Sequence, residues 1–572
     1  MSLRELVENG LWEEAVSSLL VYMQEEKLDV EKCIIGATVM EHFANYDGMK
    51  SLIYTGLKME PDNYELYLLL GNYYLGVNDK LSYLCFENAL YLAEKSGNSD
   101  DILQIKEIFD SYKEDQKIAV NNVTIVILSH NTLDYTRKCI ESIRECCRKE
   151  SCEIVVVENA STDGSIEYLR RQEDIILLEN KENVGFPAGC NQGIRAGNSN
   201  NDILLLNSDT LMMPNSLFLL RMGLYENEKN GASGAATNYA GNRQMIPFKG
   251  KDLEDYLEYA KRNNVPKDNA LEIKNMLIMF AMLIKRDVLN IVGELDEQFS
   301  PGNYEDNDYG IRLLKSGYQC VLCWNSYIHH FGSKSFGKNA KEYYSLLARN
   351  HELLEKKVDF EFAHYLSETI DCVRLMDKAD EDTISVLEVG CGLGELLSNI
   401  MYKYPGAKVS GIEPDRKVAE IANSKFNIRC IDIEREDILE EEKYDYIIFE
   451  GALETLYDPK KVLKKISNNL KENASVLASV SNLMHVDVIQ ELLQGRFTYD
   501  TDGTMDKKHI RFFTRDEIIR LFNDAGYDIE SLQGVMESGN TQFLDALMGV
   551  ENIAERHLFE VKRYLVKAKI KH

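Results

Sequence analysis

Carboxylate and amide side chains follow three apolar, strand-like segments in the middle of the chain. Segment 123–128 precedes His130 and Asn131, segment 153–157 precedes Glu158, and segment 202–206 precedes Asn207 and Asp209. In an open α/β sheet, the loops after the carboxyl ends of the strands form the ligand crevice. Oxygen ligands suit Mg²⁺ or Mn²⁺, which can bridge the oxygens of a diphosphate. The pattern therefore predicts a site for a nucleotide diphosphate and a metal ion.

A glycine-rich turn marks a second site of different chemistry, directly after the strand-like segment 386–389. Gly390, Gly392 and Gly394 allow a tight turn and the close approach of a cofactor to backbone N–H groups. A dinucleotide fingerprint needs glycine or alanine at Glu395, whose charge would repel a pyrophosphate. Glu388, just before the turn, can instead hold the cationic amino-acid part of S-adenosylmethionine.

The segments that follow the turn supply further ligand groups at their ends. Glu413 follows a segment ending at Ile412 and is placed to accept both ribose hydroxyls. Asp432 lies at the third strand end, where contacts to adenine are made. The apolar run 444–450 is expected to be the fourth strand.

These two α/β regions follow a helical one, and the chain length of 572 residues suggests about three domains. Apolar residues at helical spacing predict helices over 1–115. We predict a helical domain over 1–115, an α/β domain over 120–376 that ends in a helical stretch from 339, and a second α/β domain over 383–572. Polar linkers are expected at 110–122 and 377–383.

Composition limits the kinds of partner and compartment. The net charge of −29 argues against nucleic acid, since phosphate binding needs a basic face. Twelve cysteines without a framework are typical of reduced thiols, and the pair Cys320 and Cys323 is expected in a buried strand rather than at zinc. The apolar runs are too short to span a bilayer, and the N-terminus does not read as a signal peptide. We therefore expect a cytoplasmic protein without a transmembrane segment.

The middle region resembles the inverting family 2 glycosyltransferases of the GT-A fold, with the rhamnosyltransferase-like members most similar. The resemblance rests on the loop and helix segment 180–193, the Asn207-Ser208-Asp209 segment, the Glu305-Asp306-Asn307-Asp308 segment and the pair His329-His330. It implies that Asp306 is the catalytic base and that Asp209, His329 and His330 lie at the metal and diphosphate. It also implies that Glu158, Asn183 and Asn207 contact the donor. Glu158 and Asn207 depart from the family, which prefers aspartate at both places.

The C-terminal region resembles class I methyltransferases that use S-adenosylmethionine, over roughly 384–535. Four later segments resemble enzymes of surface-polysaccharide gene clusters: 456–459, 482–485, 493–497 and 506–514. Thr455 stands where that family often has histidine in a Glu-His-Leu motif. His485 and His509 are the candidate bases that would accept the proton of a sugar hydroxyl.

The N-terminal segment 59–89 resembles a degenerate tetratricopeptide repeat. Such a region could bind a protein partner, or serve as a packing or dimerisation module. The whole chain is thus predicted to transfer a sugar from a nucleotide-sugar donor to a glycan or glycoprotein and to O-methylate it, in bacterial surface glycan or glycoprotein synthesis. The alternative is a helical-repeat scaffold with one or both catalytic domains degenerate. Donor, acceptor and oligomeric state are left open.

Overall fold

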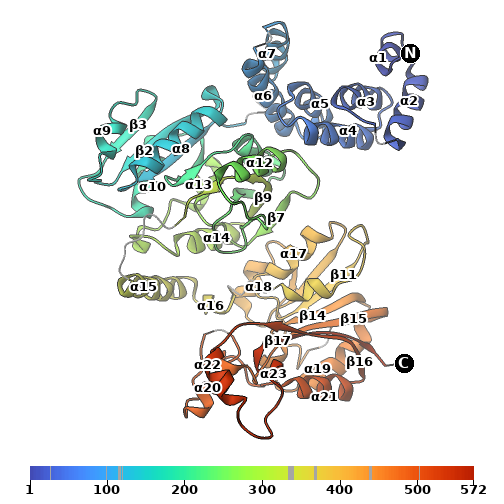
Figure 1. The fold of residues 1–572 in the computed structure, drawn as a ribbon, viewed down its shortest axis with the longest axis vertical. Coiled ribbons are helices and arrows are strands. Elements are labelled where there is room, and N and C mark those ends of the chain that lie inside the picture. Colours follow the sequence, from blue (N-terminus) through green and yellow to red (C-terminus); the bar gives the residue numbers. More distant parts are fainter. Residues whose placement is uncertain are drawn as a thin grey trace. The chain divides into compact units, whose positions relative to one another are not determined.

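The computed structural model describes residues 1–571 except 26, 98, 114–117, 119, 333–339, 366–369, 437, 439–440 and 502. The chain forms two compact units, Met1–His351 and Glu352–His572. Each unit is described by itself below, with the element labels of Figure 1.

The first part of unit one is helical throughout its described residues, as predicted. Its helices are α1 (Leu3–Glu8), α2 (Trp12–Gln24), α3 (Val30–His42), α4 (Tyr46–Met59), α5 (Tyr64–Tyr74), α6 (Asp79–Ser96) and α7 (Ser99–Lys113). Consecutive helices pack against one another, and side chains such as Asn63 and Asn78 cap their N-termini. The assignment to tetratricopeptide repeats stays a prediction.

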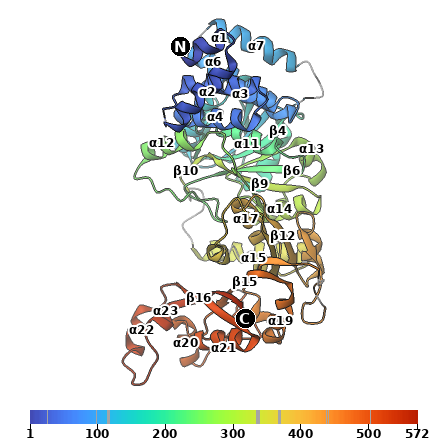
Figure 2. The ribbon, with the colours of Figure 1, turned by 90° about the vertical axis from the view of Figure 1, so that its right-hand side faces the viewer.

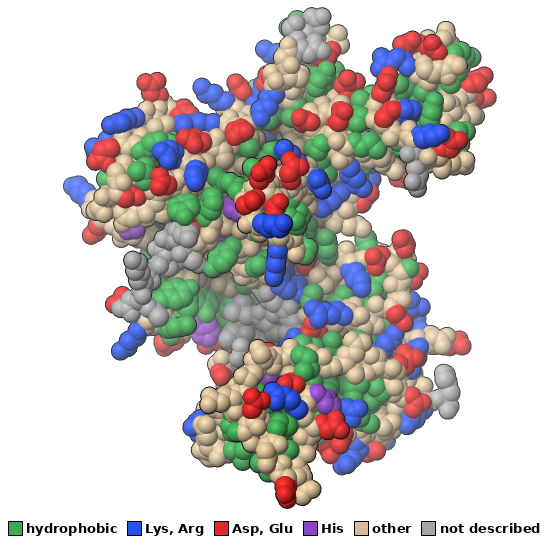
Figure 3. All heavy atoms as spheres, viewed as in Figure 1, with side chains coloured by type: hydrophobic (Ala, Val, Ile, Leu, Met, Phe, Trp, Pro, Cys, Tyr) green, Lys and Arg blue, Asp and Glu red, His purple; other side chains and the backbone are tan. Residues whose placement is uncertain are grey.

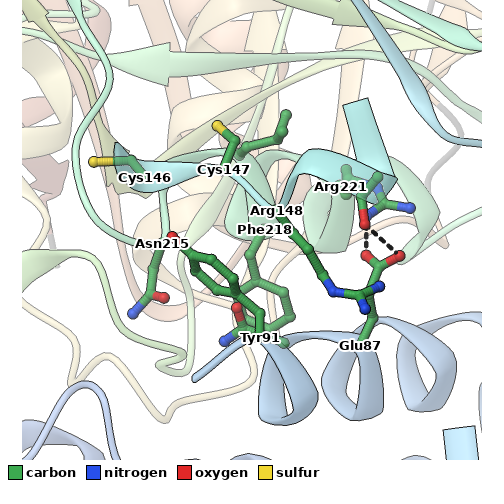
Figure 4. A pocket seen from close by; sticks show the side chains of 11 residues that line it. Glu87, Tyr91, Cys146, Cys147, Arg148, Asn215, Phe218 and Arg221 are labelled. Atoms are coloured by element: carbon green, nitrogen blue, oxygen red, sulfur yellow. Dashed lines mark hydrogen bonds and ion pairs between the residues drawn. The ribbon is translucent and has the colours of Figure 1, made fainter. Parts of the chain in front are cut away.

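These helices are joined to the α/β part of unit one by a buried ion pair. Glu87 of α6 and Arg221 of α11 (Ser216–Tyr225) meet where both side chains are almost wholly buried. Figure 4 shows them beside a small cavity between the helices and the sheet domain. Tyr67 adds an edge-on ring contact to Phe218, with ring centroids 5.5 Å apart. The structure therefore favours the packing role among the alternatives for the helical region.

An eight-stranded mixed sheet forms the rest of unit one, in the order β3-β2-β1-β4-β8-β6-β9-β7. Its strands are β1 (Val123–Ser129), β2 (Cys152–Glu158), β3 (Ile175–Glu179), β4 (Asp202–Asn207), β6 (Asn230–Ala236), β7 (Leu271–Lys274), β8 (Ala281–Ile284) and β9 (Gln319–Tyr327). Strands β1 to β4 are parallel, so their carboxyl ends share one edge. A separate ribbon pairs β5 (Thr210–Leu211) with β10 (His329–His330) beyond that edge.

The helices of the sheet domain alternate with these strands, which is the GT-A-like pattern expected. They are α8 (Leu133–Cys146), α9 (Ser165–Leu169), α10 (Phe186–Ala196), α12 (Leu253–Asn263), α13 (Arg286–Val292) and α14 (Glu305–Lys315). Helix α10 packs on β1 and β2 because glycines allow close approach. A methyl group at Gly189 would lie 2.3 Å from Leu128. Cys320 and Cys323 are buried in β9, as predicted.

Unit two is a Rossmann-like sheet in the order β13-β12-β11-β14-β15-β17-β16. Its strands are β11 (Ser385–Val389), β12 (Lys408–Ile412), β13 (Asn427–Arg429), β14 (Tyr444–Glu450), β15 (Leu470–Ser481), β16 (Tyr527–Met536) and β17 (Val561–Ile570). The first five are parallel, whereas β17 runs antiparallel between β15 and β16. The predicted fold class is thereby confirmed.

The helices of unit two are mostly short. They are α16 (Phe362–Tyr365), α17 (Glu395–Lys403), α18 (Arg416–Ala422), α19 (Pro459–Ile466), α20 (Val486–Leu493), α21 (Arg515–Ala525), α22 (Thr541–Leu547) and α23 (His557–Glu560). Helices α19 and α21 pack side by side, as Figure 2 also shows.

The division between the units lies earlier than the predicted boundary at 376. Helix α15 (Ala340–Val358) crosses it, and the turn Asp371–Leu375 packs on β14, β15 and β17 of unit two. Residues 352–376 thus group with the second sheet. Of the predicted linker at 110–122, the first residues belong to α7, which continues to Lys113. Residues 114–117 and 119 of this linker lie outside the described residues.

The surface of both units mixes the two signs of charge. In Figure 3, acidic and basic side chains alternate over the visible face, so the acidic excess forms no single patch there. Among the described helices, none is both long and apolar enough to cross a membrane.

The buried ion pair between the helices and the sheet domain gives a stability prediction. We expect Glu87→Ala to destabilise unit one by about 3–5 kcal/mol, because Arg221 is left charged and buried, with the Asn121 carbonyl still bound but without its carboxylate partner. The matched control is Glu94→Ala, which removes a half-exposed partner of Arg148 and should cost about 1 kcal/mol or less. Thermal unfolding measures both variants, and equal small losses would contradict the structural role of the pair.

Candidate functional site

The carboxyl edge of the first sheet holds Glu158 in a fixed position. Glu158 ends β2 and is fully buried, and both of its carboxylate oxygens accept the backbone N–H of Ser161, at 3.0 and 3.2 Å. Charge on a buried carboxylate is stabilised by such N–H donors. A neighbouring imidazole, that of His130, shares a hydrogen bond of 2.7 Å with the carbonyl of Asn159.

Asn183 lies in a chain of amide hydrogen bonds along the same edge. Its oxygen accepts from Gly185 N at 2.9 Å and from the Asn159 side chain at 3.1 Å. Asn180 in turn donates to Asn159 at 2.7 Å and to Gln192 at 2.8 Å. The structure therefore joins Asn183 and the loop after Glu158 in one hydrogen-bonded network, and their contact with a donor stays a prediction.

Asp209 and His330 meet beyond the end of β4. The two side chains are buried, and Nε2 of His330 lies 3.2 Å from Oδ1 of Asp209. Tyr239 fixes the ring from the other side, since its carbonyl lies 2.8 Å from Nδ1 of His330. Pairing of β5 with β10 creates this contact between residues over a hundred positions apart.

His329 is placed differently from its neighbour. Successive residues of a strand face opposite sides, and the ring of His329 packs among Tyr256, Tyr327 and Phe331. Its Nδ1 lies 2.8 Å from the Tyr327 hydroxyl. Burial, with a smaller contribution from His330, lowers the pKa of His329 to about 4. Of the three metal ligands predicted, the structure brings only Asp209 and His330 together.

The donor set suits a divalent metal that is completed by its substrate. Within the described residues, no group of three or more His, Cys, Asp or Glu side chains is placed to hold a metal ion. Asp209 and His330 offer one oxygen and one nitrogen, so diphosphate oxygens and water must fill the other positions. Asn207 ends β4 and is half-buried. Its backbone N–H donates to the carbonyl of Phe280 at 2.8 Å.

The three carboxyl groups at the start of α14 differ in burial, pKa and ion pairing. Glu305 is buried, and this burial together with the charge of Asp306 raises its pKa to about 8. Asp308 is paired with Arg312 at 2.8 Å, which ties the helix to the carbonyls of Val292 and Glu294. Asp306 is half-buried, and burial raises its pKa to about 6. Only Asp306 thus combines access, ionisation near neutral pH and the absence of a basic partner among the described residues.

In the second sheet, Glu388 is the penultimate residue of the inner strand β11, just before the glycine turn. Its side chain is buried, and the Oε2 atom has no hydrogen-bond partner among the described residues. Burial, with the charges of Glu450 and Glu413, raises the pKa of Glu388 well above its usual value. An unsatisfied buried carboxylate is costly. Such a group fits a ligand that brings a positive charge, such as the ammonium of S-adenosylmethionine.

The glycine turn is built from left-handed conformations. Gly390, Gly392 and Gly394 have φ of +75°, +53° and +80°. Gly392 N donates to Oε2 of Glu413 at 2.9 Å, while Asp415 N donates to Oε1 at 2.9 Å. These bonds fix the Glu413 carboxylate against the turn, and its contact with a ribose stays a prediction.

Asp432 lies at the third strand end, outside this hydrogen-bonded group. It is partly exposed, accepts the N–H of Glu434 at 3.0 Å and pairs with Arg435 at 3.2 Å. One carboxylate oxygen is thus used to shape the local turn, and the other faces an exposed arginine.

Two further glutamates at this edge, the half-buried Glu450 and the buried Glu454, are absent from the sequence-based site. Glu450, at the end of β14, accepts the N–H of Cys372 at 3.1 Å and keeps one oxygen without a partner among the described residues. Glu454 accepts the N–H of Ser481 at 2.7 Å, and its carbonyl accepts those of Ile510 and Arg511. The motif comparison at Thr455 points directly at Glu454, which occupies the glutamate of that motif.

The two candidate histidines lie in different surroundings. His509 is buried, interacts electrostatically with Glu454, and its Nδ1 lies 3.1 Å from the carbonyl of Thr504. Since a carbonyl only accepts, Nδ1 is the nitrogen that donates to it, and Nε2 is the nitrogen left for contact with another group. His485 instead points Nε2 toward the Glu537 carbonyl at 3.3 Å, and its Nδ1 lies 3.7 Å from Asp487. The structure thus brings His509, not His485, to the strand-end glutamates.

Similar proteins fall on the same two regions. Residues 124–290 match glycosyl transferase family 2, and residues 359–532 match a methyltransferase domain. An N-methyltransferase 4 of Papaver somniferum is 28% identical over 131 residues, which cover 22% of this chain and 36% of the relative. A malonyl-[acyl-carrier protein] O-methyltransferase of Bacillus anthracis is 28% identical over 127 residues, covering 21% and 45%. The chain therefore spans less than half the length of these curated relatives.

Among solved structures, GalNAc-T7 with UDP, GalNAc and Mn²⁺ is similar at 13% identity and a TM-score of 0.34, covering 44% of this chain and 52% of that one. The first match covers β1 to β8 and ends before α14, β9 and β10, and the second covers β11 to β15 and part of β16. The chain therefore joins a family 2 glycosyltransferase domain to an S-adenosylmethionine-dependent methyltransferase domain.

Proposed function

We propose that the chain transfers a sugar from a nucleotide-sugar donor to a hydroxyl of a glycan or glycoprotein, with inversion, and O-methylates that sugar with S-adenosylmethionine. A role in bacterial surface glycan or glycoprotein synthesis belongs to the same proposal. The observation that carries it is the difference in pKa and ion pairing among the α14 carboxyl groups, which leaves Asp306 as the base of the first site. The second site rests on Glu388 and Glu413 around the glycine turn.

In the first reaction, Asp306 accepts the proton of the acceptor hydroxyl as its oxygen attacks the anomeric carbon. The bond from that carbon to the diphosphate breaks at the same time, so the sugar changes configuration once. Glu158 and Asn183 hold the nucleotide end of the donor at the strand edge. Asp209 and His330 would bind Mn²⁺ or Mg²⁺, which would offset the charge that develops on the leaving diphosphate.

In the second reaction, Glu388 binds the ammonium of S-adenosylmethionine and Glu413 binds its ribose hydroxyls. When bound, this cofactor supplies an electrophilic methyl group on a sulfonium. His509 accepts the proton of the sugar hydroxyl at Nε2, because Nδ1 already donates to Thr504. Glu454, buried nearby, stabilises the positive charge that His509 gains.

The role of Asp306 is tested by the pH dependence of sugar transfer. The base acts when ionised, and its pKa is about 6, so kcat/KM should be level above pH 7 and fall as the pH drops through 6. Asp306→Asn should lower kcat by about 10²- to 10⁴-fold. Its affinity for S-adenosylmethionine is the control and should be unchanged. A variant that keeps its rate, or a wild-type profile that is flat from pH 5 to 8, would remove Asp306 from the mechanism.

The assignment of the methyl-transfer base is tested with a pair of variants. We expect His509→Asn to lower the rate of methyl transfer by about 10²- to 10⁴-fold without changing the affinity for S-adenosylmethionine. His485→Asn serves as the matched control: it loses a buried ring, so it should lower the melting temperature and leave the rate of the folded enzyme within a few-fold. The reverse order of rates would assign the base to His485.

The glycine turn is tested by cofactor binding alone. Gly392 has φ of +53°, and a methyl group there would lie 2.9 Å from the Tyr365 ring. We expect Gly392→Ala to weaken S-adenosylmethionine binding at least tenfold in calorimetry, because the turn must shift. Gly526→Ala is the control, since Gly526 has φ of +91° with no atom within 4 Å. Equal affinities in the two variants would contradict the cofactor site.

A further inference from the structure

A tyrosine from the start of unit two lies directly against the glycine turn. Tyr365 ends α16, and its Cδ1 atom would be 2.9 Å from a methyl group at Gly392. The N–H of Gly392 is the group that holds Glu413. The charges of Glu413 and Asp415 also act on the Tyr365 hydroxyl. The tyrosine ring therefore forms a wall of the proposed cofactor site.

A lysine from the far end of the unit approaches the same ring. Nζ of Lys508 lies 4.6 Å from the Tyr365 ring centroid, within cation–π range. The backbone of this segment is fixed, because Asp506 accepts the N–H of Lys508 at 2.8 Å and the Glu454 carbonyl accepts the next amides along the chain. The lysine is thus presented to the site from a defined direction.

The ammonium of Lys508 is half-buried and has no carboxylate partner within hydrogen-bond distance among the described residues. Burial lowers its pKa, while the charges of Glu361 and Glu413 act in the opposite direction. The neighbouring Lys507 differs in this respect, since its ammonium pairs with Glu361 at 3.1 Å. A cation that is partly desolvated without an ion pair suits an anionic ligand.

The charges around the turn show what such a ligand must carry. Two buried carboxyl groups, Glu388 and Glu413, and the half-buried Glu450 lie at the strand ends. They attract the ammonium and sulfonium of S-adenosylmethionine but repel its one carboxylate. A cation beside the turn, such as Lys508, removes this conflict, because it offers the carboxylate an opposite charge.

We propose that Lys508, oriented by the Tyr365 ring, binds the carboxylate of S-adenosylmethionine. The inference rests on the proposed methyl donor and adds the recognition of its amino-acid end. Lys508 acts as a binding residue, and Tyr365 positions its ammonium.

Decarboxylated S-adenosylmethionine separates this role from a general effect on the pocket, since it lacks only the group in question. Titration calorimetry of the full chain should show that the wild type binds S-adenosylmethionine at least tenfold more tightly than the decarboxylated analogue. Lys508→Met should lose about 10- to 100-fold in affinity for S-adenosylmethionine and should bind the analogue as the wild type does. Lys507→Met is the matched control and should bind both ligands normally.

Tyr365→Leu removes the ring and should lower only the affinity for S-adenosylmethionine, not that for the decarboxylated analogue. The loss should be smaller than in Lys508→Met. If Lys508→Met loses the same affinity for both ligands, or loses affinity for neither, the assignment of Lys508 to the carboxylate is overturned. A thermal melt of each variant identifies misfolding, and Lys508→Arg then provides a second folded probe that should retain the preference for the carboxylate. A wild type that binds neither ligand would instead reject the methyl donor of the proposed function.

Discussion

Both sheets depend on the same constraint, which is that the carboxylates of Glu158, Glu413, Glu450 and Glu454 lie at or just after the ends of parallel strands, where no Lys or Arg of the described residues forms an ion pair with them. Backbone N–H groups take that role instead: Ser161 for Glu158, Gly392 and Asp415 for Glu413, Cys372 for Glu450, and Ser481 for Glu454. A backbone donor fixes a carboxylate in place but carries no net charge. Each edge is therefore pre-organised, and a ligand with cationic or hydroxyl groups gains interactions that the protein alone does not supply.

The two edges use this constraint for different chemistry. In unit one, burial keeps Glu305 protonated near neutral pH and leaves Asp306 to ionise, while Asp308 forms an ion pair with Arg312. In unit two, the excess of carboxyl groups around the turn is matched by one half-buried lysine, Lys508. A proton acceptor and a binding site for a cationic cofactor thus arise from the same kinds of side chain, and the surroundings of each decide its role.

Sequence patterns predicted the strands and their end residues because alternation and turn chemistry are local. Strands β1, β2 and β4 agree with the predicted segments to within about one residue, and Glu158, Asp209, Glu388 and Glu413 lie at strand ends. Contacts across the chain were beyond such patterns. His329 and His330 are adjacent in sequence, yet only the pairing of β10 with β5 decides that His330 faces Asp209. Glu454, Tyr365 and Lys508 were missed because their contacts, such as that of Lys508 with the Tyr365 ring, join residues that lie far apart in the sequence.

The helical region illustrates the same limit, and it bears on what that region does. Its amphipathic pattern predicted helices but could not show that Arg221 lies against Glu87, 134 residues away. Asn215 makes the same connection, since it donates to the Tyr67 hydroxyl at 3.0 Å and to the Pro61 carbonyl at 3.2 Å. A module held only by a flexible linker would leave these polar groups in water. Because these groups are buried, α5 and α6 pack against the glycosyltransferase domain. The helices therefore contribute to the stability of that domain whether or not their outer surface binds a partner.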